Sequence, residues 1–347
     1  MRRVVMTRCP VGGASEIALR KGWLREAFLG LGAELVMLQS LPEKEHVKHY
    51  TQEPPLTFRD GGNVPPIWSH SRGVKTKVIA LTAVKQSHAL IVAPDSGIRS
   101  VEELRGKKLS IPDFEDAVID FLRAMTLRGY DTILKGFHIG EDEVRFVKTK
   151  ASLRHNRRRM DEEGRGIDGE PDKEPEDFIS EHAEQLKELK EGKIDGFFAH
   201  RSLVGQIVNR GLGKVLIDIA DSDLDPVNNI YPSVITVDEE FANNNRDLVV
   251  AYLRQLLRAS RWAKGHGQEL AEIASGSQYG ATEQDILATR KTLWDPGFSP
   301  NLETETVRML GSQKEFLLEH GFITADFSLK EWIDPSYLEE ALQSPKQ

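Results

Sequence analysis

Short apolar segments alternate with amphipathic ones along most of this chain, and this alternation is the feature that most restricts its fold. Residues 4–6 are apolar and stop at a Pro- and Gly-containing loop signal. Residues 14–29 have apolar side chains at helical spacing, and residues 33–38 are typical of a buried strand. This order predicts the βαβ unit of an α/β sheet. Cys9 then falls where the first strand ends, at the edge where open α/β sheets bind ligands.

The same alternation continues and predicts an α/β protein with two lobes. Further strands are expected at residues 77–81, 89–93, 108–112, 144–148, 194–199, 215–219 and 233–237. Helices are expected at residues 116–128, 181–191, 248–264, 268–275, 283–294 and 303–319. The chain has 347 residues. Because a single hydrophobic core stops growing at roughly 250–300 residues, two lobes sharing a cleft are expected.

Residues 150–190 break this pattern. A short basic run is followed by acidic residues and a Gly- and Pro-containing stretch, which predicts a solvated loop on a compact lobe. The run lacks interleaved aromatic residues, so it is a poor match to a nucleic-acid site. The whole chain has 46 Lys and Arg against 54 Asp and Glu, a net charge of −8. That balance argues against nucleic acid or an anionic membrane surface as a partner.

The N-terminus and the single cysteine exclude further classes of protein. Three apolar residues follow Arg3 before Thr7 and Arg8, far fewer than the roughly 7–15 of a secretion signal. No stretch approaches the roughly 18 apolar residues of a membrane helix. We therefore expect a cytoplasmic protein without a membrane span, and we expect it to be monomeric. Cys9 is the one cysteine, which excludes an intramolecular disulfide and any multi-cysteine metal site.

Residues 49–66 have little regular-structure signal but contain several chemically useful side chains. Arg59 offers a planar fork that matches a carboxylate, sulfinate or phosphate. His49 can tune or deprotonate a thiol, and the Gly61-Gly62 pair lets backbone N–H groups approach a ligand closely. Each residue also has a plainer interpretation. A lone cysteine is more often a small buried hydrophobe than a nucleophile, and a lone His or Arg is usually structural or solvated.

Together these residues resemble the aryl sulfinate desulfinases. The likeness is carried by the series Cys9-Pro10-Val11, His49, Arg59, Gly61-Gly62 and Pro65-Pro66, and its specific part is the spacing of Cys-Pro-Val, His, Arg and Gly-Gly. The resemblance implies the type II periplasmic-binding-protein fold, an α/β fold with two lobes around a central cleft. It places residues 1–93 and 224–347 in a discontinuous lobe that contains Cys9, and residues 94–223 in an inserted lobe. Nitrate-, taurine- and thiamine-precursor-binding proteins share this fold.

The resemblance also implies an activity. An aromatic sulfinate and water would give the arene and sulfite, with no metal or organic cofactor. Cys9 would be the catalytic thiol and His49 its partner. Arg59 would hold the sulfinate oxygens through two parallel charge-assisted bonds, helped by the backbone N–H of Gly62. Gly61 would also contact the substrate, beside Gly62.

Two mechanisms fit Cys9. As a general acid it protonates the ring carbon that bears sulfur, which requires a thiol; as a nucleophile it attacks sulfur, which requires a thiolate of lowered pKa. His49 can deliver or accept the proton in either case. We favour protonation, because an electron-rich hydroxylated ring stabilises the cation that forms. Arg8 directly precedes Cys9 and favours the other mechanism, since a cation beside the thiol stabilises the thiolate.

Three residues of the expected inserted lobe are candidates for the opposite wall of the cleft. The strand predicted at 194–199 runs into His200 and Arg201. If their side chains face the cleft, the ligand is more polar than a biphenyl and has a second acid group. Alternatively, they cap the next helix or pair with surface acids. Phe114 precedes a predicted helix and is either a lid aromatic or a core residue.

Two other functions stay open from the sequence. A solute-binding protein for a small organic anion, serving a transporter, would have the same fold. An aromatic-acid decarboxylase is electronically parallel, because loss of CO2 after proton delivery to a ring carbon resembles loss of SO2. The Cys-His-Arg arrangement favours the desulfinase over the solute-binding protein, because a protein that only binds gains nothing from it.

Overall fold

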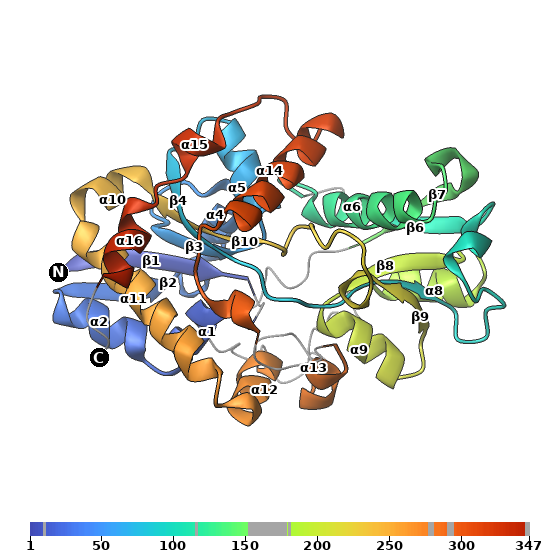
Figure 1. Cartoon of the computed structure of the whole chain (residues 1–347), viewed down its shortest axis with the longest axis horizontal. Coiled ribbons are helices and arrows are strands. Elements are labelled where there is room, and N and C mark those ends of the chain that lie inside the picture. Colours follow the sequence, from blue (N-terminus) through green and yellow to red (C-terminus); the bar gives the residue numbers. More distant parts are fainter. Residues whose placement is uncertain are drawn as a thin grey trace.

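The computed structural model contains two five-stranded sheets (Figure 1). It describes residues 1–9, 12–114, 117–151, 179, 182–276, 281–289 and 295–343. The first sheet has the order β2 (Ala33–Met37), β1 (Arg2–Arg8), β3 (Phe58–Gly61), β10 (Ser233–Asp238) and β4 (Thr76–Thr82). The second has the order β7 (Arg145–Lys150), β6 (Lys108–Asp113), β8 (Gly196–His200), β5 (His88–Val92) and β9 (Lys214–Asp218).

Each sheet has one strand that runs against the others, and this is the strand that arrives from the other sheet. β10 pairs antiparallel with β3 and β4, and β5 pairs antiparallel with β8 and β9. Residues 83–87 connect β4 to β5, and residues 219–232 connect β9 to β10. Both crossings therefore enter the receiving sheet where its parallel strands end. The carboxyl-terminal edges of the two sheets face each other, with the crossings between them (Figure 1).

Helices cover both faces of each sheet. In the first lobe, α1, α2, α11 and α16 share one core with the first sheet, and α5, α14 and α15 share another on its opposite face. In the second lobe, α6 covers one face of the sheet, and α8 and α9 cover the other. The layers are those of an α/β protein with two lobes.

The helices have these bounds: α1 (Ala14–Arg20), α2 (Trp23–Gly30), α3 (Glu43–His46), α4 (Lys48–Thr51), α5 (Val64–Ser71), α6 (Phe121–Gly136), α8 (Ala183–Lys190), α9 (Ser202–Asn209), α10 (Glu239–Asn244), α11 (Arg246–Ala263), α12 (Gly267–Ser275), α13 (Glu283–Thr289), α14 (Thr304–Glu319), α15 (Leu329–Trp332) and α16 (Ser336–Leu342). Short 3-10 turns are η1 (Leu38–Ser40), η2 (Val101–Leu104), η3 (Glu141–Glu143), η5 (Ile219–Asp221) and η6 (Pro296–Phe298). Within the described ranges, no helix is long and apolar enough to cross a membrane.

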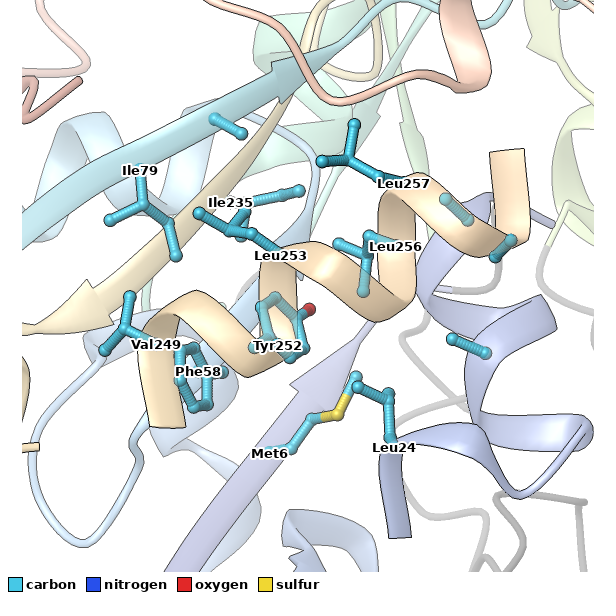
Figure 2. Close-up of a cluster of buried hydrophobic side chains, with 14 of the residues drawn as sticks. Met6, Leu24, Phe58, Ile79, Ile235, Val249, Tyr252, Leu253, Leu256 and Leu257 are labelled. Carbon is cyan, nitrogen blue, oxygen red and sulfur yellow. The ribbon is translucent and has the colours of Figure 1, made fainter. Parts of the chain in front are cut away.

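Figure 2 shows how α11 packs over the first sheet. Its buried side chains Val249, Tyr252, Leu253 and Leu256 recur at three- and four-residue spacing, as in an amphipathic helix. The ring of Tyr252 stacks on Phe58 of β3, with 4.4 Å between the ring centroids. Strand β3, at the centre of the first sheet, is therefore held from one side by α11.

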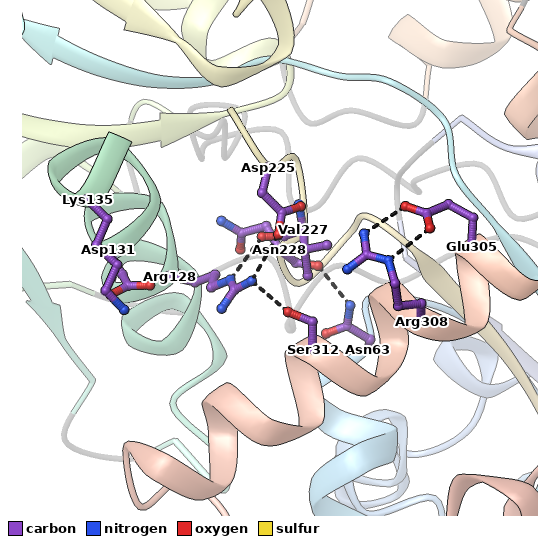
Figure 3. Close-up of polar contacts among 10 residues, drawn as sticks. All are labelled: Asn63, Arg128, Asp131, Lys135, Asp225, Val227, Asn228, Glu305, Arg308 and Ser312. Carbon is purple, nitrogen blue, oxygen red and sulfur yellow. Dashed lines mark hydrogen bonds and ion pairs between the residues drawn. The ribbon is translucent and has the colours of Figure 1, made fainter. Parts of the chain in front are cut away.

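Polar contacts join α6 of the second lobe to the crossing that returns to the first lobe (Figure 3). Arg128 Nε donates to the Val227 carbonyl at 3.3 Å. Asn228 Nδ2 donates to the Met125 carbonyl at 3.1 Å, and the Asn228 carbonyl accepts from Asn63 Nδ2 at 2.8 Å. The start of α5 is thereby tied through the crossing to α6.

The predicted strands and helices are confirmed in most places, and the main differences are the following. The helix expected at residues 14–29 is two helices, because Gly22 has a φ of 75° and breaks the chain direction between them. The helix expected at 116–128 begins later, at Phe121, and runs on to Gly136. Strand β3 lies within residues 49–66, where no strand was expected, and each sheet contains both parallel and antiparallel pairs.

The lobe boundaries after residues 93 and 223 stay predictions. Strand β5 pairs within the second sheet, so the chain leaves the first sheet before residue 88, earlier than expected. The loop expected at 150–190 lies mostly outside the described residues, as do Pro10, Val11 and the end of the helix expected at 283–294.

We expect Leu253→Ala to lower the free energy of unfolding by about 2–5 kcal/mol, because it removes a fully buried side chain from the core in Figure 2. Urea unfolding followed by circular dichroism measures the change. The matched control is Leu29→Ala on α2, whose side chain is 66% exposed and whose loss should change stability by at most about 0.5 kcal/mol. Equal effects of the two substitutions would contradict the packing described here.

Candidate functional site

Strand β1 delivers Cys9 to the carboxyl edge of the first sheet. The Cys9 N–H donates to the Asp60 carbonyl at 2.8 Å, which extends the β1–β3 pairing by one residue. The thiol side chain is partly buried. A Cβ atom on Gly61 would lie 2.3 Å from Cys9 Sγ, a distance that no side-chain atom tolerates. The sulfur therefore occupies space that exists because residue 61 is glycine.

His49 lies beside this sulfur, and a chain of hydrogen bonds orients its ring. Its Nε2 is 3.5 Å from Cys9 Sγ, and its Nδ1 is 2.9 Å from Thr7 Oγ1. Gln39 Nε2 donates to the same Thr7 oxygen at 2.7 Å, so the Thr7 hydroxyl hydrogen is available to His49. When the Thr7 hydroxyl donates to Nδ1, the hydrogen of the neutral imidazole is on Nε2, which faces Cys9.

Arg59 of β3 is buried and joins three parts of the site. Its Nε donates to the His49 carbonyl at 2.8 Å and its Nη1 donates to the Gly62 carbonyl at 2.8 Å. Its Nη2 donates to Cys9 Sγ at 3.8 Å. Burial lowers the pKa of the guanidinium from its usual value, although arginine stays charged in proteins. The N–H groups left over on Nη1 and Nη2 can face a ligand, so the expected grip on two sulfinate oxygens stays a prediction.

The backbone of Gly62 adds a further donor. Its N–H has no hydrogen-bond acceptor among the described residues, although the residue is buried. A Cβ atom on Gly62 would lie 2.6 Å from Asn229 Oδ1, and that oxygen accepts from the Val64 N–H at 3.0 Å. Glycine at this position therefore lets Asn229 hold the start of α5, and it leaves a backbone N–H available to an anion.

Arg8 does not act on the thiol as its place in the sequence suggested. Side chains alternate along a strand, so Arg8 points away from Cys9. Its Nη2 lies 3.1 Å from Glu16 Oε1, and both side chains are only 1% exposed. The positive charge of Arg8 is therefore compensated by Glu16, beneath the sheet edge.

Asp60 lies on the same side of the first sheet as Arg8, its register partner on β1. Its carboxyl group accepts a hydrogen bond from Ser15 Oγ of α1. Burial raises the pKa of Asp60 to about 6, although Ser15 and the nearby Arg59 and Arg8 oppose this shift. The first lobe thus contains a buried, titratable carboxyl group directly behind the segment that holds Cys9.

The other three predicted residues lie at the facing edge of the second sheet. Phe114 follows β6 and is buried in the core under α6, which favours the core interpretation. His200 ends β8, and Arg201 follows as the N-cap residue of α9, without a side-chain cap hydrogen bond. Arg201 Nη2 lies 3.4 Å from His200 Nε2. The structure thus joins Cys9, His49, Arg59, Gly61 and Gly62 in one group, and His200 and Arg201 in a second group.

The sequence analysis missed Thr7, Gln39 and Asn229. Thr7 could have been found, because it lies two residues before Cys9 on the same strand and therefore on the same face. Gln39 follows β2, the neighbour of β1, so its nearness depends on strand order. Among the described residues, no group of three or more His, Cys, Asp or Glu side chains could hold a metal ion.

Comparisons with known proteins place this geometry in context. No family model matches the chain. It is 22% identical to 2'-hydroxybiphenyl-2-sulfinate desulfinase of Rhodococcus erythropolis, over 97% of this chain and 92% of that protein. A solved Cys-to-Ser variant of the enzyme DSZB, in complex with biphenyl-2-sulfinic acid, is similar with a TM-score of 0.75 and 20% identity, covering 98% and 99% of the two chains.

Non-enzymatic proteins share the fold. The periplasmic aliphatic sulphonate binding protein SsuA from Escherichia coli is similar with a TM-score of 0.66 and 11% identity, covering 96% of this chain and 92% of that one. At these identities the likenesses show the fold. This chain has a two-lobed, type II periplasmic-binding-protein-like fold, as predicted, and a distant likeness to the desulfinase over nearly its full length.

We expect Gly61→Ala to displace the Cys9 sulfur, because the new Cβ atom would overlap it. Overpacking of this kind costs about 1–3 kcal/mol of stability, measurable by urea unfolding, and should also change the rate of alkylation of Cys9 by iodoacetamide. Gly30→Ala is the matched control, because nothing lies within 4 Å of the added Cβ atom at the end of α2. An unchanged alkylation rate in Gly61→Ala would count against the close contact.

We expect Asp60 to make stability fall as the pH rises from about 4 to about 6. The folded state keeps the Asp60 proton up to a pKa of about 6, whereas the unfolded state releases it near 3.8, so the folded state binds more protons in this window. Relative to wild type, Asp60→Asn should therefore gain up to about 3 kcal/mol between pH 4 and pH 7. Urea titrations at several pH values measure this, and a pH-independent difference would refute it.

Proposed function

We propose that this protein is a cysteine-dependent desulfinase that cleaves the carbon–sulfur bond of an aromatic sulfinate and releases sulfite. The observation that supports it most is the position of Cys9 Sγ, 3.5 Å from His49 Nε2 and 3.8 Å from Arg59 Nη2. A thiol between an imidazole and a guanidinium can give up a proton and remain as a stabilised thiolate. The distant likeness to 2'-hydroxybiphenyl-2-sulfinate desulfinase supports the choice of substrate class.

In the proposed reaction the sulfinate binds at the carboxyl edge of the first sheet. The N–H of Gly62, which has no acceptor among the described residues, and the remaining N–H groups of Arg59 are the donors proposed to bind it. Charge-assisted hydrogen bonds to a sulfinate are stronger than those to a neutral group, so these donors would fix the sulfur end of the substrate. The ring carbon attached to sulfur would then lie next to the Cys9 thiol.

The chemical step begins with transfer of the Cys9 proton to that ring carbon. The carbon–sulfur bond breaks, its electron pair restores the aromatic ring, and the sulfur leaves as SO2. Water adds to SO2 to give hydrogen sulfite and a proton, and this proton returns to the thiolate. The balance is therefore one sulfinate and one water for one arene and one hydrogen sulfite, and the proton moves between the thiol, the ring carbon and water.

His49 and Arg59 would stabilise the thiolate that forms when Cys9 loses its proton. Both groups direct an N–H toward the sulfur, and their positions are set before the reaction by Thr7 and by backbone carbonyls. Donors that are already in place stabilise the transition state more than the ground state, because negative charge appears on the Cys9 sulfur only as the proton leaves.

A second candidate function is binding without turnover. The likeness in fold to the aliphatic sulphonate binding protein supports it, because the same two-lobed frame serves there as a binding protein. The Gly62 N–H and Arg59 would suit an anion in either case. The pairing of Cys9 with His49 favours the enzyme, since a protein that only binds its ligand needs no thiol held against an imidazole.

Sulfite release from a panel of aromatic sulfinates, followed with a thiol-independent sulfite assay, tests the proposal. We expect wild-type protein to release sulfite and Cys9→Ser to lower kcat by about a hundred- to ten-thousand-fold, because it replaces the acid. His49→Gln should also lower kcat. The matched control is His46→Gln on α3, whose ring bonds to the Leu41 carbonyl and should leave kcat within about threefold.

Binding and turnover, measured on the same panel of sulfinates, separate the two functions. Calorimetry shows whether each sulfinate binds, and the sulfite assay shows whether it is consumed. Tight binding of sulfinates by wild-type protein with no sulfite from any of them would overturn the desulfinase and establish the binding protein. Full activity of Cys9→Ser would also overturn the proposed mechanism.

A further inference from the structure

The edge of the second sheet that faces Cys9 has its own polar group, formed by His88, His200 and Arg201. His200 is the last residue of β8 and His88 is the first of β5, and the two are direct partners in the strand register. Residues 83–87 link β5 to the edge of the first sheet, and five residues span at most about 20 Å. These side chains therefore lie at the sheet edge that faces the first lobe.

A chain of ring contacts connects this group to the site in the first lobe. The His88 ring stacks on Phe198, with 6.2 Å between centroids, and Phe198 packs against Gly129 of α6. At its other end, α6 begins with Phe121, whose ring stacks on Tyr50 at 5.8 Å. Tyr50 is next to His49, and the two rings make an edge contact at 5.0 Å. His88 thus lies on the face of the second sheet that α6 covers. The first residue of α6 contacts Tyr50, which lies next to His49, the partner of the Cys9 thiol.

Arg201 gives the group a positively charged side chain. It is 8% exposed, and because a guanidinium has only donors, it is the donor in its 3.4 Å contact with His200 Nε2. Burial and the nearby charge of Arg201 lower the pKa of His88 to about 3, so His88 is neutral near pH 7. Among the described residues, Asp218 is an acid beside His88, and its Oδ1 accepts from the backbone N–H groups of His88 and Ala220.

His88 has hydrogen-bonding capacity that the fold does not use. The residue is 3% exposed, yet its Nε2 has no partner within the described part of the chain. A buried polar atom without a partner costs free energy, and ligands commonly satisfy such atoms. Together with the guanidinium of Arg201, this nitrogen can bind an oxygen that arrives with a ligand.

The backbone at Arg201 is also unusual. Its φ of 52° and ψ of −142° lie in a region that glycine adopts freely and other residues avoid. Strain of this kind persists where the surroundings hold the residue in place, and it is found most often at binding sites and active sites. An arginine at a position suited to glycine therefore suggests that its side chain is needed there.

We propose that His88, His200 and Arg201 form a second anion-binding site and that the substrate is an aromatic sulfinate with a carboxylate group. This inference rests on the proposed function and extends it to the substrate. The sulfinate would bind at the first edge, near Cys9, Arg59 and Gly62. The carboxylate would accept charge-assisted hydrogen bonds from Arg201 and, when Nε2 has its hydrogen, from His88. The aromatic ring would span the two edges, so the distance between its acid groups would set the specificity.

Calorimetric titration of Cys9→Ser protein tests the site without turnover. The ligands are benzenesulfinate, its three ring-carboxylated isomers, and the matching carboxamides, which have the same shape without the charge. We expect at least one carboxylated isomer to bind about tenfold tighter than benzenesulfinate and its carboxamide. Arg201→Gly should reduce this ratio to within about threefold. Glycine suits the backbone at this position, so this variant is expected to fold.

The matched control is Arg145→Ala, which removes an exposed arginine from β7 of the same sheet and should leave the ratio unchanged. His88→Asn provides a second variant that is independent of the backbone at Arg201, and it should also lower the ratio. The same comparison is made with Cys9 intact, as the ratio of kcat/KM values for sulfite release.

The outcomes separate the two proposals. Sulfite release with equal kcat/KM for carboxylated and unsubstituted sulfinates would overturn the second site and leave the desulfinase standing. Tighter binding of a carboxylated ligand through Arg201 without any sulfite release would overturn the desulfinase and leave the second anion site standing. A loss in Arg201→Gly and His88→Asn that is equal for charged and uncharged ligands would show a structural role and overturn the inference.

Discussion

The guanidinium of Arg59 is the group on which the arrangement of the site depends. It is 1% exposed, and it bonds to two backbone carbonyls, of His49 and Gly62, and to the sulfur of Cys9. A buried charge is costly unless hydrogen bonds compensate it, so these contacts are needed to keep the guanidinium in place. Because two of the acceptors belong to the backbone, the guanidinium cannot move without moving the segments on either side. The Cys9 thiol, the His49 imidazole and the Gly61-Gly62 segment are therefore held together before any ligand arrives.

Strand β3 is the strand that could not be predicted from the sequence. The other strands of both sheets were visible as apolar runs, because their side chains fill the layers between sheet and helices. Strand β3 is central and buried on both faces, a position that favours continuous apolar sequence. Its residues Arg59 and Asp60 are instead charged, and each enters a different polar cluster on opposite faces of the sheet. Apolar periodicity cannot reveal a strand whose side chains serve a site rather than a core.

The residue types of the site could be predicted from the sequence, but their contacts could not. The chemistry of thiol, imidazole and guanidinium made Cys9, His49 and Arg59 candidates. That Arg59 also binds the His49 backbone, and that Gln39 reaches Thr7, depends on strand order and loop path. Sequence proximity misled for Arg8, because neighbours in a strand point to opposite faces. In the structure Arg8 pairs with Glu16 of α1. Glu16 also pairs with Arg20, four residues later on that helix.

The topology explains how one frame can serve both binding and chemistry. Each sheet receives one strand from the other, so the edges that meet are both edges where parallel strands end and where side chains and free N–H groups are available to ligands. Binding an anion requires donors at fixed positions, and both edges have them. In the proposed reaction, catalysis requires in addition a proton that moves, and only the first edge combines a thiol with donors that stabilise it once ionised. On this reasoning, donors on the first edge act in the transition state, whereas those on the second edge bind substrate and transition state alike and so select the substrate.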